Sequence, residues 1–312
     1  MRRTLPLIAL ALTVPAAAQN GGPPPFVIAE TGKGYATIDD AVTAARDDTV
    51  TILIAPGVYR QCTVQTGGLI TYKARQPGTV VFDGTTCEGK AAFVLRGRGS
   101  IVDGIVFRNL RVDDGNGAGI RIETGDLTVS NAMFLDSQEG ILGGGHETVR
   151  HIRIDRSTFS GLGQCDETVD CSHSIYLGFD GELTVTRSRF EQGTGGHYVK
   201  ARAAHVRIEN NSFDDSRGDK TNYMIDLSEG GTGTIAGNTF VQGTRKENWT
   251  AFITIGAEKR TYSSDGLTIR DNVATLAPGM TKSPAFVADY TGARIVMENN
   301  RLGEGVRPFE KR

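Results

Sequence analysis

The sequence has little tryptophan and little net charge, and the small net charge bears on which partners the protein can bind. It contains one tryptophan, aromatic residues make up 7% of the chain, and the formal net charge is −2 over 312 residues. A near-neutral chain lacks the basic excess that is typical of nucleic-acid-binding proteins, so no nucleic-acid partner is expected. Affinity for a polyanion would have to come from a local basic cluster.

Long apolar runs are absent beyond the first 18 residues. At the start, Arg2 and Arg3 precede the apolar run Leu5–Val14 and the small residues Ala16–Ala18. This order is typical of a secretory signal peptide cleaved before Gln19, and it favours that interpretation over a twin-arginine or lipoprotein signal. We therefore expect residues 1–18 to be a signal peptide. The mature protein should be a periplasmic or secreted monomer with no membrane partner.

Cysteine is scarce, and its spacing does not suggest a metal site. The chain has four cysteines and no C-x-x-C pair. Export to an oxidising compartment favours disulfides over metal ligation. Three pairings are possible, and proximity along the chain favours Cys165 with Cys171 and Cys62 with Cys87.

Glycine, in contrast, is abundant with 40 residues, and short motifs recur between the glycine-rich turns. One motif has an aliphatic residue, two others, Asn or Ser, one more, and a large apolar residue. Its copies begin roughly 23 to 34 residues apart, a spacing found in solenoid repeats. They start at Ile105, Val129, Ile154, Val185, Ile208, Ile235, Ile269 and Met297. We expect each copy to be a strand followed by a turn, with Asn211, Asn238, Asn272 and Asn300 stacked in a hydrogen-bonded column.

A second type of strand lies between these copies. The segments "GIRIE", "SIYLG", "HYVKA", "YMIDL" and "FITIG" alternate with a period of two. Two or three short strands per repeat, each pairing with its counterpart in the next, describe a parallel β-helix. Before them, Ile38, Ala41, Val42 and Ala45 lie on one face of a predicted helix, which is suited to capping the open end. The sequence thus predicts an all-β fold, with a single parallel β-helix domain over 19–306 and a frayed C-terminal tail over 307–312.

The start of the mature chain adds a family resemblance. "TIDDAVTAA" followed by "TILIAPGVYR" resembles the opening of the pectate-lyase-like superfamily of right-handed parallel β-helix proteins. The resemblance implies a right-handed solenoid with polysaccharide as the default ligand. It does not imply one activity, because this superfamily includes lyases, hydrolases, esterases, epimerases and phage-tail proteins.

The candidate site comes from aligning the second strands by their inward residues. Ile120, Ile175, Val199, Ile225 and Ile253 are taken as equivalent. The next outward column then contains Arg121, Tyr176, Lys200, Asp226 and Thr254. A second outward column, two residues further along, contains Glu123, Gly178, Arg202, Ser228 and Gly256. On the preceding side lie His173, His197 and Tyr223. Coils are about 4.8 Å apart, so these groups should cluster. An exposed ion pair between Lys200 and Asp226 is the plain alternative. The concentration of charged and aromatic groups in three adjacent coils favours a functional site.

Such a cluster suits β-elimination on a uronate. That reaction needs a base beside the carboxylate, an acid for the leaving oxygen, and a cation that stabilises the enolate-like intermediate. Lys200 is the candidate base, Tyr176 or Tyr198 the acid, His197 an alternative acid or base, and Arg202 the carboxylate-binding cation. The predicted substrate-binding residues are Tyr198, Tyr223, Asp226, His173 and Arg121.

One coil carries a narrower resemblance. "HYVKARAAHVRIENNSF" is similar to a coil of the chondroitinase-B and alginate-lyase family, and this implies that Lys200 matches the catalytic lysine of that family. The next coil departs from the family, because "YMIDLSEGG" has Asp226 where an arginine is expected. The expected function is an exported lyase acting on an acidic, uronate-containing polysaccharide.

Three alternatives stay open. They are a uronan C5-epimerase, a glycoside hydrolase using Asp226 and Glu229, and a non-catalytic glycan-binding β-helix. Calcium is a possible cofactor through Asp226, Glu229 and Glu123, but no calcium-loop motif accompanies these carboxylates. No metal or other cofactor is therefore predicted.

Overall fold

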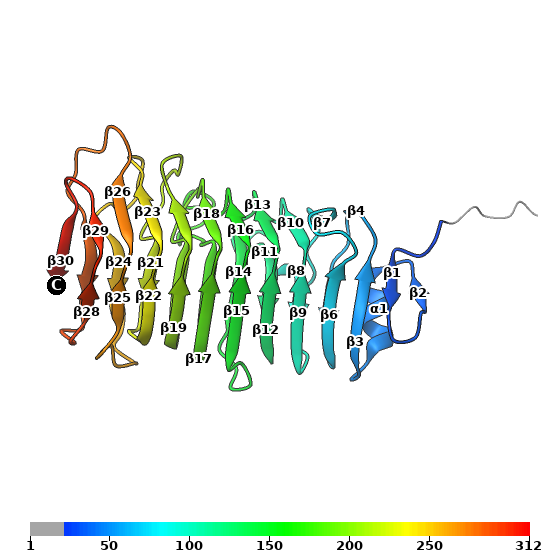
Figure 1. The fold of residues 1–312 in the computed structure, drawn as a ribbon. Helices are drawn as coiled ribbons and strands as arrows, with labels where there is room; N and C mark the ends of the chain where they lie inside the picture. The colour runs from blue at the N-terminus through cyan, green and yellow to red at the C-terminus, as the bar shows by residue number, and fades with distance from the viewer. Residues whose placement is uncertain (1–21) are drawn as a thin grey trace, which may run out of the picture.

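The chain winds into one elongated solenoid (Figure 1). The structure is a computed structural model, and it describes residues 22–312. The predicted signal peptide, 1–18, lies outside the described residues. Within 22–312, no helix is both long enough and apolar enough to cross a lipid bilayer.

Each full coil contributes three short strands, one to each face of the solenoid. Strands on a face pair in parallel with the coils before and after them, so the hydrogen bonds run along the solenoid axis. The first face contains β5 (Thr63–Gln65), β8 (Ala91–Leu95), β11 (Ala118–Ile122), β14 (Glu139–Gly144), β17 (Ile175–Thr186), β19 (Val199–Glu209), β21 (Ile225–Leu227), β24 (Ala251–Ile255), β27 (Ala285–Asp289) and β30 (Arg307–Lys311).

The second face begins where the first one bends. β17 and β19 are long enough to contribute to both faces, and their pairing shifts register between Phe179 and Glu182. The other strands of the second face are β3 (Thr49–Ile54), β6 (Leu69–Ala74), β9 (Gly99–Asp103), β12 (Asp126–Ser130), β15 (His151–Asp155), β22 (Thr232–Ala236), β25 (Thr268–Arg270) and β28 (Val296–Glu298).

The third face is a separate sheet of ten strands that closes each coil. It contains β4 (Gly57–Tyr59), β7 (Val80–Asp83), β10 (Ile105–Arg108), β13 (Met133–Leu135), β16 (Thr158–Ser160), β18 (Arg189–Glu191), β20 (Ser212–Asp214), β23 (Thr239–Gln242), β26 (Val273–Leu276) and β29 (Arg301–Leu302). At the corner that leads into it, one residue per coil has positive φ, for example Asn131, Asn210 and Asn299. Asparagine tolerates this left-handed backbone better than most residues, and this explains its frequency at the corner.

Both ends of the solenoid are closed by secondary structure. At the N-terminal end, α1 (Ile38–Ala45) buries the four apolar residues of its predicted face, and β1 (Phe26–Ile28) pairs with β2 (Gly34–Tyr35) and β3. The predicted capping helix is confirmed. At the other end, β30 pairs with β27, so the prediction of a frayed tail over 307–312 is wrong. The tail forms a strand because its backbone satisfies the open edge of the first face.

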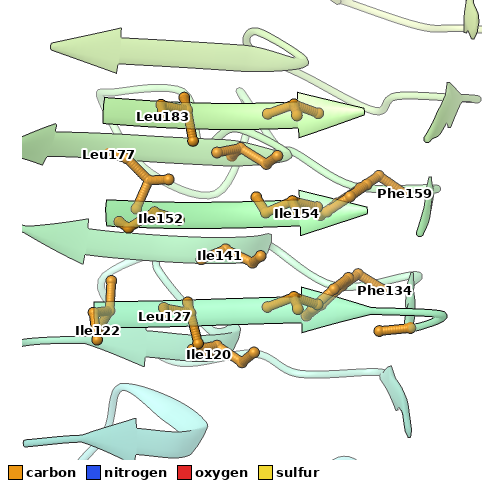
Figure 2. Close-up of a cluster of buried hydrophobic side chains, with 14 of the residues drawn as sticks. Ile120, Ile122, Leu127, Phe134, Ile141, Ile152, Ile154, Phe159, Leu177 and Leu183 are labelled. Carbon is orange, nitrogen blue, oxygen red and sulfur yellow. The ribbon is translucent and has the colours of Figure 1, made fainter. Parts of the chain in front are cut away.

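A column of stacked phenylalanine side chains runs through the interior of the solenoid. Six phenylalanines stack in successive coils with ring centroids 4.8 to 5.2 Å apart: Phe107, Phe134, Phe159, Phe190, Phe213 and Phe240. Figure 2 shows Phe134 and Phe159 with aliphatic residues of adjacent coils. Stacked aromatic pairs contribute about 0.5–1.5 kcal/mol each beyond their buried area.

The predicted asparagine column is confirmed. Asn211 Nδ2 donates to Asn238 Oδ1 at 3.0 Å, and the same bond repeats from Asn238 to Asn272 and from Asn272 to Asn300. Each Oδ1 also accepts from a backbone N–H of the preceding coil. The ladder therefore satisfies amide groups that would otherwise be buried without partners.

Both predicted disulfides form. Cys62 bonds to Cys87, and Cys165 bonds to Cys171. The second disulfide closes the loop 165–171, which projects beside the first face and walls a cleft.

Candidate functional site

A cleft of about 670 Å³ lies over the middle of the first face. Its floor comes from β14, β17 and β19, and residues 168–171 of the disulfide-closed loop form one wall. Lys200, Arg202, Tyr176 and His173 line it, as do two residues that the sequence did not suggest, Glu139 and Glu258.

The outward column through this cleft has the predicted register. Tyr176 pairs with Lys200, Lys200 with Asp226, and Asp226 with Thr254. Arg121 belongs to the same column but is separated from Tyr176 by Leu142 of β14. The sequence alignment passed over this intervening coil, because "GILGGG" carries no charge in the column.

Two cations and a phenol meet in the cleft. The Arg202 guanidinium donates to the Tyr176 hydroxyl, and its carbon lies 4.9 Å from the centre of the Tyr176 ring. The Lys200 ammonium lies 5.3 Å from the same ring centre, and only 12% of its side chain is exposed. A tyrosine face so close to two cations holds both in a defined position by cation–π attraction.

Glu258 places a carboxylate between these cations. Lys200 Nζ donates to Glu258 Oε1 at 2.6 Å, and Arg202 donates to Oε2. Partial burial acts to raise the pKa of Glu258, but the hydrogen bonds from Arg202 and Lys200 prevail and lower it. The Lys200–Arg202 pair is therefore arranged to hold a carboxylate.

Next to this column, two histidines stack on a tyrosine. The ring centroids of His173 and His197 are 4.8 Å apart, and those of His197 and Tyr223 are 5.5 Å apart. The backbone N–H of His197 donates to His173 Nδ1 at 3.0 Å, so this nitrogen of His173 is unprotonated. Tyr223 is nearly buried, and its hydroxyl accepts from Asn248.

Burial keeps both histidines neutral. It lowers the pKa of His197 to about 4, against the attraction of Asp226. It also lowers the pKa of His173 well below 6.5, and the neighbouring His197 and Lys200 add to this effect. Of this stack, His173 lines the cleft, and its ring is uncharged around neutral pH.

Glu139 continues the histidine side of the cleft into β14. It is 1% exposed, and neither carboxyl oxygen has a hydrogen-bond partner. Burial raises the pKa of Glu139 well above its ordinary value, and the opposing effects of the His173 backbone N–H and the Arg121 charge do not cancel this. A carboxyl group in this environment is held in its neutral, protonated form.

Asp226 lies in the predicted column but is not open to a ligand. It is 3% exposed and accepts from Ser228 at 2.7 Å and from Thr254 at 2.8 Å. His197 Nε2 is 3.6 Å from Asp226 Oδ2. The prediction of direct substrate contact is wrong for Asp226, because neighbouring side chains cover it. Its position suits it to orient His197.

Tyr198 was predicted to bind substrate, and this too is wrong. Its side chain points into the solenoid, is 1% exposed, and donates its hydroxyl proton to Asp215 at 2.9 Å. Tyr198 precedes β19 at the corner where the coil enters the first face. There two consecutive residues, Tyr198 and Val199, both face inward, so the strict alternation used for the prediction does not apply.

The cleft continues into two smaller cavities. One of about 330 Å³ is lined by Arg121, Arg202 and Tyr176 over a floor of Gly143–Gly145 and Gly178. The next, of about 510 Å³, shares Gly145, Gly178 and Arg202 with it. Arg202 lines all three cavities, so they form one groove centred on this residue.

The residues present do not fit a calcium site. Asp226 is engaged by Ser228 and Thr254, Glu229 lies beside Arg202 and Thr261, and Glu123 pairs with Lys90 and Arg96. These carboxylates do not converge on one point. Among residues 22–312, no group of three or more His, Cys, Asp or Glu side chains is placed to hold a metal ion.

Two of the cleft residues were missed for different reasons. Glu139 lies two positions before the inward Ile141, as His173 lies before Ile175, so aligning the β14 coil would have found it. Glu258 comes from the loop after β24 and reaches across the coils to Lys200. No periodic signal marks such a loop residue.

Comparison with known proteins defines the class. A family model described as "Right handed beta helix region" matches residues 91–304. The chain belongs to this family, and its right-handed parallel β-helix fold is that of the pectate-lyase-like superfamily. No curated protein matches the sequence.

Similar solved structures include enzymes and an adhesin. A PL6 family alginate lyase, AlyGC, is 17% identical, with a TM-score of 0.50 over 86% of this chain and 38% of that one. A pectin methylesterase bound to a hexasaccharide is 11% identical, with a TM-score of 0.45 over 90% and 78%. The Streptococcus pneumoniae surface protein and adhesin PfbA is 11% identical, with a TM-score of 0.42 over 87% and 94%. This chain thus spans well under half of the alginate lyase, and at these identities the likeness establishes the fold alone.

Proposed function

We propose that the protein is an exported polysaccharide lyase that cleaves a uronate-containing polymer by β-elimination. The observation that carries this proposal is the Glu258 carboxylate held by Lys200 and Arg202 on the face of Tyr176. A substrate carboxylate that replaces Glu258 meets the Arg202 guanidinium, with the Lys200 amino group beside it as the base. The two disulfides are compatible with an exported protein.

The chemistry follows from the position of the three groups. Lys200, in its neutral form, takes the proton from C5 of the uronate, and the electron pair forms the C4–C5 double bond as the C4–O bond breaks. The leaving oxygen takes a proton from the Tyr176 hydroxyl, to which Arg202 is bonded. Arg202 stabilises the charge that develops on the substrate carboxylate. His173 is the neutral side chain that lines the cleft beside these three groups, with His197 stacked behind it.

The test is an ultraviolet assay for the unsaturated uronate product across alginate, polygalacturonate, chondroitin and bacterial exopolysaccharides. Lys200→Ala should lower the rate by about 10²- to 10⁴-fold, the usual contribution of a general base. Lys259→Ala is the matched control, because Lys259 is an exposed lysine that lines none of the three cavities.

Other outcomes would identify the alternatives. New reducing ends without the ultraviolet signal would favour a hydrolase. Solvent deuterium entering C5 without chain cleavage would favour a C5-epimerase, which begins with the same proton abstraction. Binding without turnover, with Lys200→Ala changing only affinity, would favour a glycan-binding β-helix and contradict the proposal.

A further inference from the structure

The charged residues that line the groove differ between its centre and its two ends. The middle cavity, of about 330 Å³, is lined by Arg121 and Arg202 and by no carboxylate. The nitrogen Nε of each of these arginines is buried and has no hydrogen-bond partner. Glu123 is 4.0 Å from the Arg121 nitrogen and Glu229 is 3.3 Å from the Arg202 nitrogen, in neither case with hydrogen-bond geometry. The centre of the groove thus carries two guanidinium cations whose Nε donors no carboxylate among residues 22–312 satisfies.

The floor of the middle cavity is made of glycine. A Cβ at Gly144 would lie 2.6 Å from the carbonyl oxygen of Gly178, and Gly144 has a φ of +86°, so no other residue fits without strain. Leu142 and Tyr176 border this flat surface. The shape and chemistry suit a sugar ring lying flat with its carboxylate toward Arg202, the residue that also borders the cavity containing Lys200.

Both ends of the groove are acidic. Asp114 and Asp170 line the cavity on the side of the disulfide-closed loop, where Lys200 is the additional cation and Glu258 is the carboxylate that the substrate replaces. Glu147, Asp180 and Glu229 line the cavity at the other end, which adds no cation of its own to Arg202. Arg150 pairs with Asp180 at 3.5 Å, but both side chains are exposed and the pair is weak.

This pattern discriminates between polymers. A carboxylate at the centre is attracted, whereas carboxylates on the adjoining sugars would face side chains of the same charge. Neutral sugars at those places instead offer hydroxyl groups that donate to Asp and Glu. We propose that the substrate is a heteropolysaccharide in which isolated uronates are flanked by neutral sugars, and not a polyuronate with a charge on every residue. This inference rests on the proposed function.

Binding to polymers of graded charge tests it. The Tyr176→Phe variant, which lacks the proposed proton donor but keeps every charge of the groove, is titrated at low ionic strength with two series. These are polygalacturonate with increasing methyl esterification and alginate with increasing carboxyl reduction, together with deacylated gellan as a polymer with sparse uronates. Affinity should pass through a maximum at intermediate charge density, about tenfold tighter than for the fully charged polymer, and should fall again when all carboxylates are neutralised.

A charge-neutralising variant provides the second measurement. Glu147→Gln with Asp180→Asn, at two exposed positions, should tighten binding of the fully charged polymers several-fold and leave the sparse ones within about twofold. Glu298→Gln with Glu304→Gln removes the same charge from exposed positions that line none of the three cavities. This control should change neither affinity.

The outcomes separate this inference from the proposed function. Affinity that rises steadily up to full charge, with lyase turnover of those polymers by the unmodified protein, overturns the inference alone. Failure to bind any member of the panel overturns both.

Discussion

Two clusters of buried ionisable groups lie on opposite sides of the chain around β19, and they differ in how fully their polar atoms are partnered. On the inner side, Asp215 accepts from Tyr198, Thr221 and Lys246, and the Lys246–Asp215 pair is 1% exposed at both ends. On the outer side, Glu139, His197 and Arg202 all have buried polar atoms without a partner. Buried polar groups are normally satisfied, so the inner cluster stabilises the fold, and we propose that the outer one meets a ligand.

The largest effect is expected from breaking the inner cluster. Lys246→Ala would leave the Asp215 carboxylate buried without its cation, and the free energy of unfolding should fall by about 3–5 kcal/mol. Denaturant unfolding measures this. Lys200→Ala, in the outer cluster, should change stability by less than about 1 kcal/mol while it lowers turnover by about 10²- to 10⁴-fold. If Lys200→Ala were the more destabilising of the two, the division into structural and functional clusters would be wrong.

The next largest effect is a loss of folding stability at acidic pH, which comes from the histidines of the outer cluster. The pKa of His197 is about 4 in the folded protein and about 6.5 when unfolded, so the unfolded state binds more protons below pH 6.5. Stability should therefore fall on acidification from pH 7 to 5, by on the order of 2 kcal/mol from His197 alone. His173 contributes in the same direction. Thermal unfolding across this range, with His197→Asn compared with the exposed control His205→Asn, measures the contribution. An unchanged pH dependence in His197→Asn would contradict it.

Glu139 has a smaller effect on folding stability, and this effect destabilises the protein as pH rises instead of as it falls. Because its pKa is raised in the folded state, stability is lost as pH rises above about 4.5, where the unfolded carboxyl ionises. Glu139→Gln removes that ionisation and should stabilise the protein on the order of 1 kcal/mol at pH 8 but not at pH 4. Melting temperatures of the two proteins at both pH values provide the comparison. A stabilisation of the same size at pH 4 would show that ionisation is not its cause.

The smallest effect is expected on polymer affinity when Glu258 is substituted. In the free protein its carboxylate pairs with Lys200 and Arg202 of the outer cluster. Glu258→Gln removes the carboxylate that competes for Lys200 and Arg202. Because a partly exposed ion pair contributes at most about 1 kcal/mol, affinity for a uronate-containing polymer should improve by about two- to fivefold. Titration calorimetry would measure it, with Glu304→Gln as the control. Weaker binding in Glu258→Gln would instead show that Glu258 contacts the substrate.

The solenoid was predictable because its repeats are periodic. The Asn211–Asn300 column and the Tyr176–Lys200–Asp226 register both follow from aligning inward residues of successive coils. The same alignment could not predict which of the aligned side chains are buried. Asp226 has the predicted register, but it is buried beside Ser228, Thr254 and His197, and register alone does not predict how closely such side chains pack.

The errors arise where the period breaks. Tyr198 lies at a corner where two adjacent residues face inward, so a rule of strict alternation assigns it to the wrong side. Residues 307–312 show no repeat motif, yet β27 presents an edge that they complete. Local pattern therefore located the cleft, and tertiary contact decided which of its side chains are accessible.

The asparagine and phenylalanine columns have a consequence for how such a molecule can change in length. The same amide bond joins the coils from Asn211 to Asn300, and the same stacked ring joins those from Phe107 to Phe240, so the junctions within each column are nearly interchangeable. Duplicating or deleting one whole coil would preserve every junction, whereas the loss of a single residue within a coil would misalign all of them. A β-helix of this kind can therefore be lengthened by units of one coil without altering the coils on either side.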